Sequence, residues 1–522
     1  MAEFIKIPEF KYKGIKRIEI PKVDDDFRGT DLGEAIIRKY LPEILSTHQK
    51  NAAKINFLYN YYLGMQDILN KERLYSKDSD NNNIVVENHA YRQVNFKVGF
   101  LTGEKREYTH KADTDTDDLI FLDRYFTNVK FFSKDTDLKD WIYATGIGCT
   151  YTAPRTDIIF TDANGVTRYK TANEGFDVNF DAPFTFSTIN PTENFVVYSS
   201  RFDKNPLFCV SVVEVDVGNS ETVEKRKELH IETRYASFLI QSDLSYSTFY
   251  FPDNDRMIGK PKTLNYLPII EYSTNAERMG IVELNRELFN SINTLKSSTE
   301  DMIVDNANAI MVFKNVDISA DDVQKMKEAG AIIISDAESS KPGSTADLKT
   351  ITIEIPFEGL STYYDQTLQQ CYDIAGVPLA SGAVTSGGDT GQARLLGGGW
   401  NNAYIIINKD INSLLRYDYE ELELILLLCK QVPNCPVDKL HASQVDIKYR
   451  INQNDNFLVK AQGIQNLYNV NMPKDEILKA SGLFNDITTV SKKWELLDKE
   501  IREKEETKEV STPSGNDNNS QE

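Results

Sequence analysis

The most distinctive candidate for chemistry in this chain is the glycine-rich stretch SGGDTGQARLLGGGW, which runs from Ser386 to Trp400. Glycine-rich loops often bind phosphates, but the nucleotide-binding loop also needs a lysine and a hydroxyl in the pattern GxxxxGK[ST]. The nearest Gly-Lys pair, Gly259-Lys260, has Asn254 where the first glycine belongs and Pro261 where the hydroxyl belongs. The sequence therefore predicts no phosphate-binding loop, and the glycines need another explanation.

Carboxylates, histidines and cysteines that could bind a metal ion are present, but their spacing fits no metal motif. In ADTDTDD, residues 112–118, a calcium loop counted from Asp113 would need glycine at Asp118 and glutamate at Arg124. The five histidines are far apart, and Cys429 and Cys435 lack histidines at zinc-site spacing. We therefore expect no metal and no cofactor, and we interpret the acidic run as a solvated helix start. A metal-dependent nuclease assembled from distant carboxylates stays open as an alternative.

The composition is typical of a soluble, acidic protein with a sizeable core. Of the 522 residues, 40% are apolar, and 79 Asp and Glu against 59 Lys and Arg give a net charge of −20. Such a chain is unsuited to holding DNA by neutralising phosphates, although it can still surround DNA. Five scattered cysteines favour a reducing compartment. The N-terminus has no secretory signal pattern, and the most apolar run, Leu424 to Cys429, is far shorter than the roughly 20 residues that span a bilayer.

Hydrophobic periodicity divides the chain into a helical part, a β part and a second helical part. Residues 1–29 predict either an extended arm or a surface strand and loop. Helical spacing follows in four segments, at 31–70, 86–103, 117–132 and 137–143. Short period-two runs separated by turns then indicate a largely antiparallel β region over residues 147–270.

Two helices flank a small α/β insertion in the second half of the chain. The first, over residues 280–308, would be about 43 Å long and carries a narrow apolar stripe at Ile281, Leu284, Leu288, Ile292, Leu295 and Met302. The second repeats this spacing at Phe357, Leu360, Tyr364, Leu368, Cys371 and Ala375 and ends at Gly376. Such stripes are typical of helices that pack against a neighbouring helix. Between the two helices, strands are expected at 309–313, 331–335 and 351–355, with a helix from Ser319 to Gly330.

A long helix is expected after the glycine-rich stretch, over residues 403–431, with Pro433 beyond its end. A lone strand at 445–451 and short helices at 456–506 follow. The polar residues at the end of the chain predict disorder.

Four strings in this order of elements resemble the portal proteins of tailed bacteriophages, most closely the type found in siphoviruses of Gram-positive hosts. The strings are VNFKVGFLTGEKREYT (94–109), NPTENFVVYSS (190–200), LPIIEYSTNAERMGIVELNRELFNSIN (267–293) and AGVP (375–378). They are similar to the family patterns K-x-G-[FY]-L-x-G, P-x-x-x-F-x-V-Y and P-[IV]-[IV]-E-[FY]-x-x-N and to the turn that closes the second stem helix. The family's D-A-Y-N appears here only as residues 290–293, Asn-Ser-Ile-Asn, a departure that leaves the fold assignment intact.

The resemblance implies an α+β multidomain portal fold whose subunits form a ring, usually a dodecamer, around a channel at one capsid vertex. The implied parts are an N-terminal arm (1–29), a wing of helices and β region (30–275), stem helices (276–308 and 356–377), a small α/β clip (309–355), a tunnel loop (378–402), a long wing helix with a returning strand (403–452), a helical crown (453–506) and a disordered tail (507–522). The two narrow stripes suit helices that pack side by side in such a ring.

The resemblance also explains the glycine-rich stretch as a tunnel loop that projects into the DNA channel, where glycine gives the backbone freedom to follow passing DNA. The side chains expected to make polar contacts there are Thr385, Ser386, Asp389, Thr390, Gln392 and Arg394. Trp400 is expected to anchor the loop to the long helix. The acidic balance then predicts an electronegative channel wall to which phosphates do not adhere, and double-stranded DNA that passes without sequence readout.

No enzymatic activity is implied, because ATP is hydrolysed in this family by a separate terminase large subunit docked at the clip. The other implied partners are major capsid and scaffold proteins and head–tail connector proteins, with no membrane. The protein would be assembled in the host cytoplasm and reside in the virion at the portal vertex. The alternatives are another ring-forming head–tail connector protein, a metal-dependent DNA-processing enzyme, and the portal of a phage-like element that no longer packages a viral genome.

Overall fold

A computed structural model of the protein describes residues 13–70, 83–111, 117–161, 167–216, 225–241, 260–307, 310–314, 347–351, 356–379, 400–451, 457–470, 472–481 and 490–500. The chain divides into two compact units. The first combines residues 1–99, 133–152 and 186–417, and the second combines residues 100–132, 153–185 and 418–522. The predicted strand at 331–335, the helix before it and the predicted tail at 507–522 lie outside the described residues.

The first unit contains a six-stranded sheet with the order β1-β7-β8-β9-β10-β11. Its strands are β1 (Ile18–Ile20), β7 (Asn194–Ser199), β8 (Pro206–Asp216), β9 (Lys225–Thr233), β10 (Ala236–Gln241) and β11 (Lys260–Pro261). The pairs from β7 to β11 are antiparallel, whereas β1 pairs with β7 in parallel. A second sheet has the order β12-β3-β6, formed by β12 (Ile269–Tyr272), β3 (Gly148–Pro154) and β6 (Phe184–Ile189). The predicted, largely antiparallel β region is therefore confirmed.

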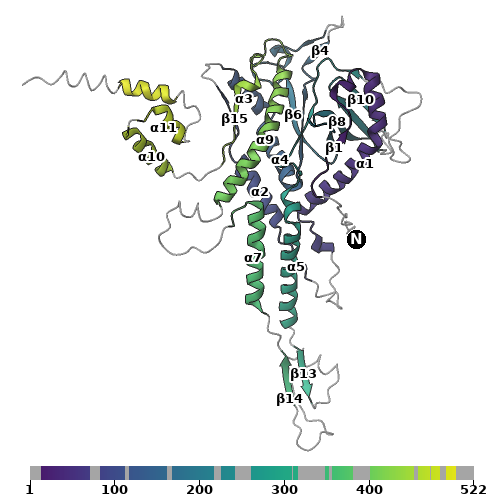
Figure 1. The fold of residues 1–522 in the computed structure, drawn as a ribbon, viewed down its shortest axis with the longest axis vertical. Coiled ribbons are helices and arrows are strands. Elements are labelled where there is room, and N and C mark those ends of the chain that lie inside the picture. Colours follow the sequence, from purple (N-terminus) through teal and green to yellow (C-terminus); the bar gives the residue numbers. More distant parts are fainter. Residues whose placement is uncertain are drawn as a thin grey trace, which may run out of the picture. The chain divides into compact units, whose positions relative to one another are not determined.

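The long helix α1 (Thr30–Tyr62) covers the six-stranded sheet in the first unit (Figure 1). Its apolar residues Ile37, Leu41 and Ile44 recur at three- and four-residue spacing, which places them on one helical face. That face is buried in one cluster with Phe27 of the short helix η1 (Asp24–Phe27) and with sheet residues that include Phe208. Burial of such side chains contributes about 1.5–3 kcal/mol each, so this layer is a principal part of the core.

The described part of the N-terminal segment, residues 13–29, differs from the expectation of an arm or a surface strand and loop. The structure has a strand there, β1, and its Ile18 and Ile20 are buried, as is Ile15 just before it, each at most 5% exposed. Ile18 and Ile20 share one face of the strand because side chains alternate with period two, and both lie in the core cluster. The alternating apolar residues of β1 therefore belong to the core, and the many lysines around them in the sequence suggested a surface segment instead.

Five helices account for most of the remaining regular structure. They are α2 (His89–Thr102), α4 (Phe131–Thr145), α5 (Ile281–Ala307), α7 (Phe357–Ala375) and α9 (Trp400–Cys429). Helices α5 and α7 lie side by side (Figure 1). In the chain between them, β13 (Ile310–Lys314) and β14 (Asp347–Ile351) form an antiparallel pair. A strand was predicted at 351–355, whereas β14 begins earlier, at Asp347. The reason is that the pairing with β13 extends from Ile351 back to Asp347.

The second unit contains α3 (Asp118–Asn128) and two small antiparallel pairs. One joins β2 (Glu107–His110) to β15 (Val445–Lys448), and the other joins β4 (Ile159–Thr161) to β5 (Thr167–Tyr169). The strand at 445–451 was expected to be alone, and this prediction is wrong. Its partner β2 reads EYTH, which has no apolar alternation and is half-buried along its whole length.

The helical C-terminal prediction is confirmed for the described residues, which include α10 (Phe457–Asn469), α11 (Lys474–Ser481) and a helix over 490–500. The described residues also contain the short helical turns η2 (Asp67–Asn70), η4 (Ala172–Glu174) and η5 (Ala442–Gln444). Among the helices that the structure describes, none combines the length and apolar character needed to cross a bilayer. The fold class is mixed α+β, as expected from the sequence.

Candidate functional site

The glycine-rich stretch is preceded by a well-defined helix end. Helix α7 finishes at Ala375, and Gly376 then adopts a left-handed backbone conformation with φ of 63°. Its N–H donates to the carbonyl of Asp373 at 3.1 Å, and the N–H of Val377 donates to the carbonyl of Tyr372 at 3.0 Å. Glycine adopts this C-terminal cap at little steric cost. Because Val377 and Pro378 are buried, the chain leaves α7 in a fixed direction before residue 380.

Replacing Gly376 with alanine should destabilise the protein by about 1–2 kcal/mol. The alanine would have to adopt the positive φ of this position, which is strained for any residue with a side chain. Its Cβ would also lie 2.3 Å from Cδ1 and 3.2 Å from Cβ of Ile406 on α9. Urea denaturation compared with the wild type measures the loss. Gly359→Ala on the same helix is the control: its Cβ meets nothing within 4 Å, and alanine favours the helix by up to about 1 kcal/mol. Equal effects of the two substitutions would contradict the proposed cap.

The other end of the stretch is the first turn of α9. This helix begins at Trp400, three residues earlier than expected. The Trp400 ring lies 5.8 Å from the ring of Phe96 on α2, and Ala403 and Ile407 are buried in the turns that follow. Both ends of the stretch are therefore fixed by packed helices. The expected role of Trp400 as a loop anchor stays a prediction.

The six side chains expected to make polar contacts lie outside the described residues. They are Thr385, Ser386, Asp389, Thr390, Gln392 and Arg394. Their roles stay predictions from the sequence.

The buried face of α5 is more polar than the apolar stripe predicts. Leu284 and Met302, both expected in the stripe, are 45% exposed, whereas Asn285, Asn293 and Ser297 are fully buried. The Oδ1 of Asn293 accepts the backbone N–H of Glu87 at 2.9 Å, and the Oγ of Ser297 accepts that of Val85 at 2.9 Å. Residues 83–88 have no helix or strand partners for their backbone, and buried backbone groups must be hydrogen-bonded. The polar side chains of α5 supply those partners.

Asn285 connects three helices at the same face. Its Nδ2 donates to Oε1 of Gln93 on α2 at 2.9 Å and to the carbonyl of Cys371 on α7 at 2.8 Å. The three buried polar residues recur at four- and eight-residue intervals, which is one helical face. Sequence reasoning missed this network, although that spacing is a signal that could have indicated it.

Glu87 is a second junction among the same helices. Its carboxylate accepts the Tyr364 hydroxyl of α7 at 2.7 Å, contacts His89 of α2 at 3.0 Å and pairs with Lys296 of α5 at 3.3 Å. Burial alone would raise the pKa of Glu87, but the hydrogen bonds from Tyr364 and His89 and the Lys296 charge hold that pKa below its ordinary value. The ionised carboxylate therefore stabilises the contact of α2 with α5 and α7.

Glu87→Gln should lower the free energy of unfolding by about 1–2 kcal/mol at pH 7. The folded-state pKa is depressed, so this stabilisation is present above the unfolded-state pKa and is lost as pH falls through the folded-state value. The difference from wild type should therefore shrink as pH falls below the ordinary glutamate pKa of about 4.3 and vanish below the folded-state pKa. Urea denaturation across that range measures it. Glu300→Gln, at an exposed position of α5, should be neutral, and a difference for Glu87→Gln that persists in acid would count against the ionic role.

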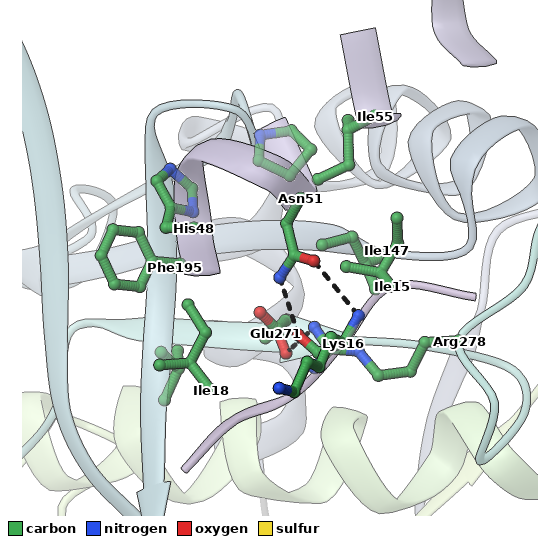
Figure 2. Close-up of a pocket in the computed structure, with 12 residues that line it drawn as sticks. Ile15, Lys16, Ile18, His48, Asn51, Ile55, Ile147, Phe195, Glu271 and Arg278 are labelled. Atoms are coloured by element: carbon green, nitrogen blue, oxygen red, sulfur yellow. Dashed lines mark hydrogen bonds and ion pairs between the residues drawn. The ribbon is translucent and has the colours of Figure 1, made fainter. Parts of the chain in front are cut away.

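A small internal cavity of about 10 Å³ lies elsewhere in the first unit, with room for about one water molecule (Figure 2). Asn51 brackets the backbone of Lys16, accepting its N–H at 3.2 Å and donating to its carbonyl at 2.7 Å. Glu271 and Arg278 form a buried ion pair at the same cavity. Burial lowers the pKa of His48 to about 4, so this imidazole is neutral and stacks on Phe195. The Nε2 of His48 lies 2.9 Å from the carbonyl of Thr192, so each of these polar groups has a partner, which is typical of a structural core.

Metal-ligating side chains do not converge in the described part of the chain, where no group of three or more His, Cys, Asp or Glu could hold a metal ion. The five cysteines are free and buried. They therefore act as small apolar side chains of the core.

Comparison with known proteins identifies one family. The family model described as "Phage portal protein, SPP1 Gp6-like" matches residues 42–393, which is more than half of the chain. A chain in the solved structure "Neck of empty GTA particle computed with C6 symmetry" is 12% identical, with a TM-score of 0.41, over 76% of this chain and 90% of that chain. No curated protein matches the sequence. The family match alone carries the assignment.

Proposed function

Because this chain belongs to the SPP1 Gp6-like family of phage portal proteins, we propose that it forms the ring-shaped channel through which double-stranded DNA enters and later leaves the capsid. The family is structural, so the protein is a portal protein rather than an enzyme. The observation that carries the proposal is the match over residues 42–393, which includes both α5 and α7 and extends into the glycine-rich stretch. It supports the resemblance found in the four sequence strings.

Exposed apolar side chains on α5 and α7 support assembly into a ring, which we propose to be a dodecamer. Leu284, Met302 and Ile303 are exposed on α5, and Phe357, Tyr363 and Ile374 are exposed on α7. Neighbouring subunits that pack these helices side by side would remove this surface from water, which is the main driving force for association. On this proposal α5 and α7 are the stem, β13 and β14 belong to the clip, and residues 378–402 are the tunnel loop.

DNA would pass the tunnel loops without sequence readout. The net charge of −20 supports a channel wall to which phosphates do not adhere, and glycines in the loop support a backbone that follows the duplex. Terminase would dock at the clip, capsid and scaffold proteins would contact the wing and crown, and head–tail connectors would follow. The protein would be assembled in the host cytoplasm and reside at the portal vertex of the virion.

Electron microscopy of the purified protein tests this function directly. We expect rings with an axial hole wide enough for duplex DNA, and particle classes with defined rotational symmetry. A protein that stays monomeric at all concentrations, or that forms assemblies without an axial hole, would overturn the proposal.

Met302→Glu should abolish or strongly reduce ring formation, shifting assembly to at least about tenfold higher protein concentration. The new carboxylate would be desolvated between neighbouring stem helices. Leu239→Glu on β10 is a matched control, because Leu239 is also 45% exposed but lies outside α5 and α7. Analytical ultracentrifugation measures both variants, and intact rings of the Met302 variant would exclude this face of α5 from the subunit interface.

A further inference from the structure

A hollow of about 290 Å³ in the first unit lies apart from the segments assigned to the channel. Tyr59 of α1 forms one side, and Asp137, Asp140 and Trp141 of α4 form another. Residues 188–190, at the end of β6, close the third side. Helices and a strand from distant parts of the sequence therefore build this pocket, and its lining residues other than Asp137 are half-buried.

The aromatic wall of the pocket is held in place by the core. The rings of Tyr59 and Trp141 stack at 4.0 Å with an angle of 17° between their planes. Trp141 also packs against the buried residues Ile15, Ile55 and Ile147. Such a fixed aromatic face attracts cations through its ring electrons.

Two carboxylates stand beside this wall without a cation. Asp137 and Asp140 lie one helical turn apart, and Trp141 follows directly on the same face of α4. Neither aspartate has a hydrogen bond or ion pair with any residue that the structure describes. The nearby lysines of α4 are directed elsewhere: Lys139 pairs with Asp135 at 3.1 Å, and the Lys134 ammonium donates to the carbonyl of Phe186.

The two neighbouring carboxylates in this hollow repel each other, and burial adds to the free-energy cost of their negative charge. Burial, together with the Asp137 carboxylate, raises the pKa of Asp140 to about 6. Burial and then the charges of Asp140 and Asp137 raise the pKa of Tyr59. A cation in the pocket would offset this repulsion.

We propose that this pocket binds an organic cation through a flat guanidinium group, such as an arginine side chain presents. A guanidinium stacks on an aromatic face and directs a fork of N–H donors toward carboxylates, whereas an ammonium is a compact point charge. The hydroxyl of Thr188, which donates to the carbonyl of Lys134, can also accept a hydrogen bond in the pocket, whereas the amide oxygen of Asn190 already accepts from the backbone N–H and the hydroxyl of Thr192. A metal ion is a poorer fit, since the lining supplies two carboxylates, and among the residues that the structure describes no group of three or more His, Cys, Asp or Glu could hold a metal ion.

The test is calorimetric titration of the purified, assembled protein at pH 7.5 with Nα-acetyl-arginine amide. Its neutral isostere Nα-acetyl-citrulline amide and Nα-acetyl-lysine amide are the comparison probes. We expect the arginine probe to bind at least about fivefold more tightly than the citrulline probe, and more tightly than the lysine probe. Equal binding of arginine and citrulline would overturn the proposal. Lysine binding as tight as arginine would overturn the guanidinium assignment.

Asp140→Asn and Asp137→Asn should each weaken arginine binding by about fivefold, whereas Asp365→Asn, at an exposed position of α7, should not.

Arginine binding should also weaken as pH falls from 7.5 to 5, because Asp140 becomes protonated. The charged or titratable groups facing Asp140 are Asp137 on its own helix and Tyr59 and Tyr62 on α1, while residues 188–190 contribute none. The Asp140→Asn variant should lose this pH dependence, and an unchanged pH profile in that variant would refute the site.

Discussion

Alanine at position 146 is expected to destabilise the first unit by more than about 4 kcal/mol. Gly146 lies between α4 and β3 with φ of 101°, a conformation that alanine adopts only with strain. A Cβ there would also lie 2.3 Å from the carbonyl oxygen of Arg278 and 2.9 Å from the backbone nitrogen of Gly280. Both obstacles are backbone atoms just before α5, so no side chain can rotate away to relieve the overlap.

Gly29→Ala separates the two causes in a matched control. Gly29 has φ of 100°, but a Cβ there would meet nothing within 4 Å. Its substitution should cost only the backbone strain, about 1–2 kcal/mol. Urea denaturation followed by circular dichroism measures both variants. If Gly146→Ala costs no more than Gly29→Ala, the close approach of the two chain segments is wrong.

The second large effect is expected for Glu283→Gln, which should destabilise the protein by about 3–5 kcal/mol. The Lys54 ammonium on α1 is 1% exposed and lies 2.6 Å from Oε1 of Glu283 on α5 and 2.8 Å from the carbonyl of Gly14. Glu283 also accepts the N–H of Gly14 at 2.9 Å. Neutralising Glu283 would leave the buried Lys54 ammonium without its counter-charge. It would also weaken the contact among three chain segments, because Lys54 of α1 and Glu283 of α5 both hydrogen-bond to the backbone of Gly14.

Removing the partner charge as well provides the decisive comparison. Lys54→Met in the Glu283→Gln background should recover at least half of the loss, because it removes the unpaired charge and keeps an unbranched side chain. Glu287→Gln, one turn along α5 at an exposed position, should change stability by less than about 0.5 kcal/mol. A double variant as unstable as Glu283→Gln alone would show that the lost ion pair does not explain the effect. The same urea denaturation measures all three.

Local periodicity predicted the elements whose apolar residues face one neighbour. The helices that became α5, α7 and α9 and the β region were found this way, and the four strings indicated the portal family that the family match confirms. The pairing partners of strands were harder to predict, because the sequence of a strand such as β15 does not indicate which other strand it pairs with. The burial of β1 depends on parallel pairing with β7, some 180 residues later in the chain, and local pattern cannot show that.

The candidate site was predictable only in part. The glycine-rich stretch and the helix end at Gly376 follow from residue type, since left-handed caps favour glycine. Glu87 and Tyr364 lie 277 residues apart and meet through folding alone. Buried Asn285 was hidden for a different reason: a pattern of apolar residues treats asparagine as a surface residue, whereas here it satisfies backbone and side-chain partners.

The polar attachments of α5 have a mechanical consequence. Apolar side chains can slip past one another by a helical turn and regain similar contacts, but Asn285, Asn293 and Ser297 each hydrogen-bond to particular groups at fixed positions. Axial sliding of α5 would break all of these bonds together and leave buried polar groups without partners. Helix α5, the extended residues 83–88 and the end of α7 should therefore tilt as a single lever when force acts on them.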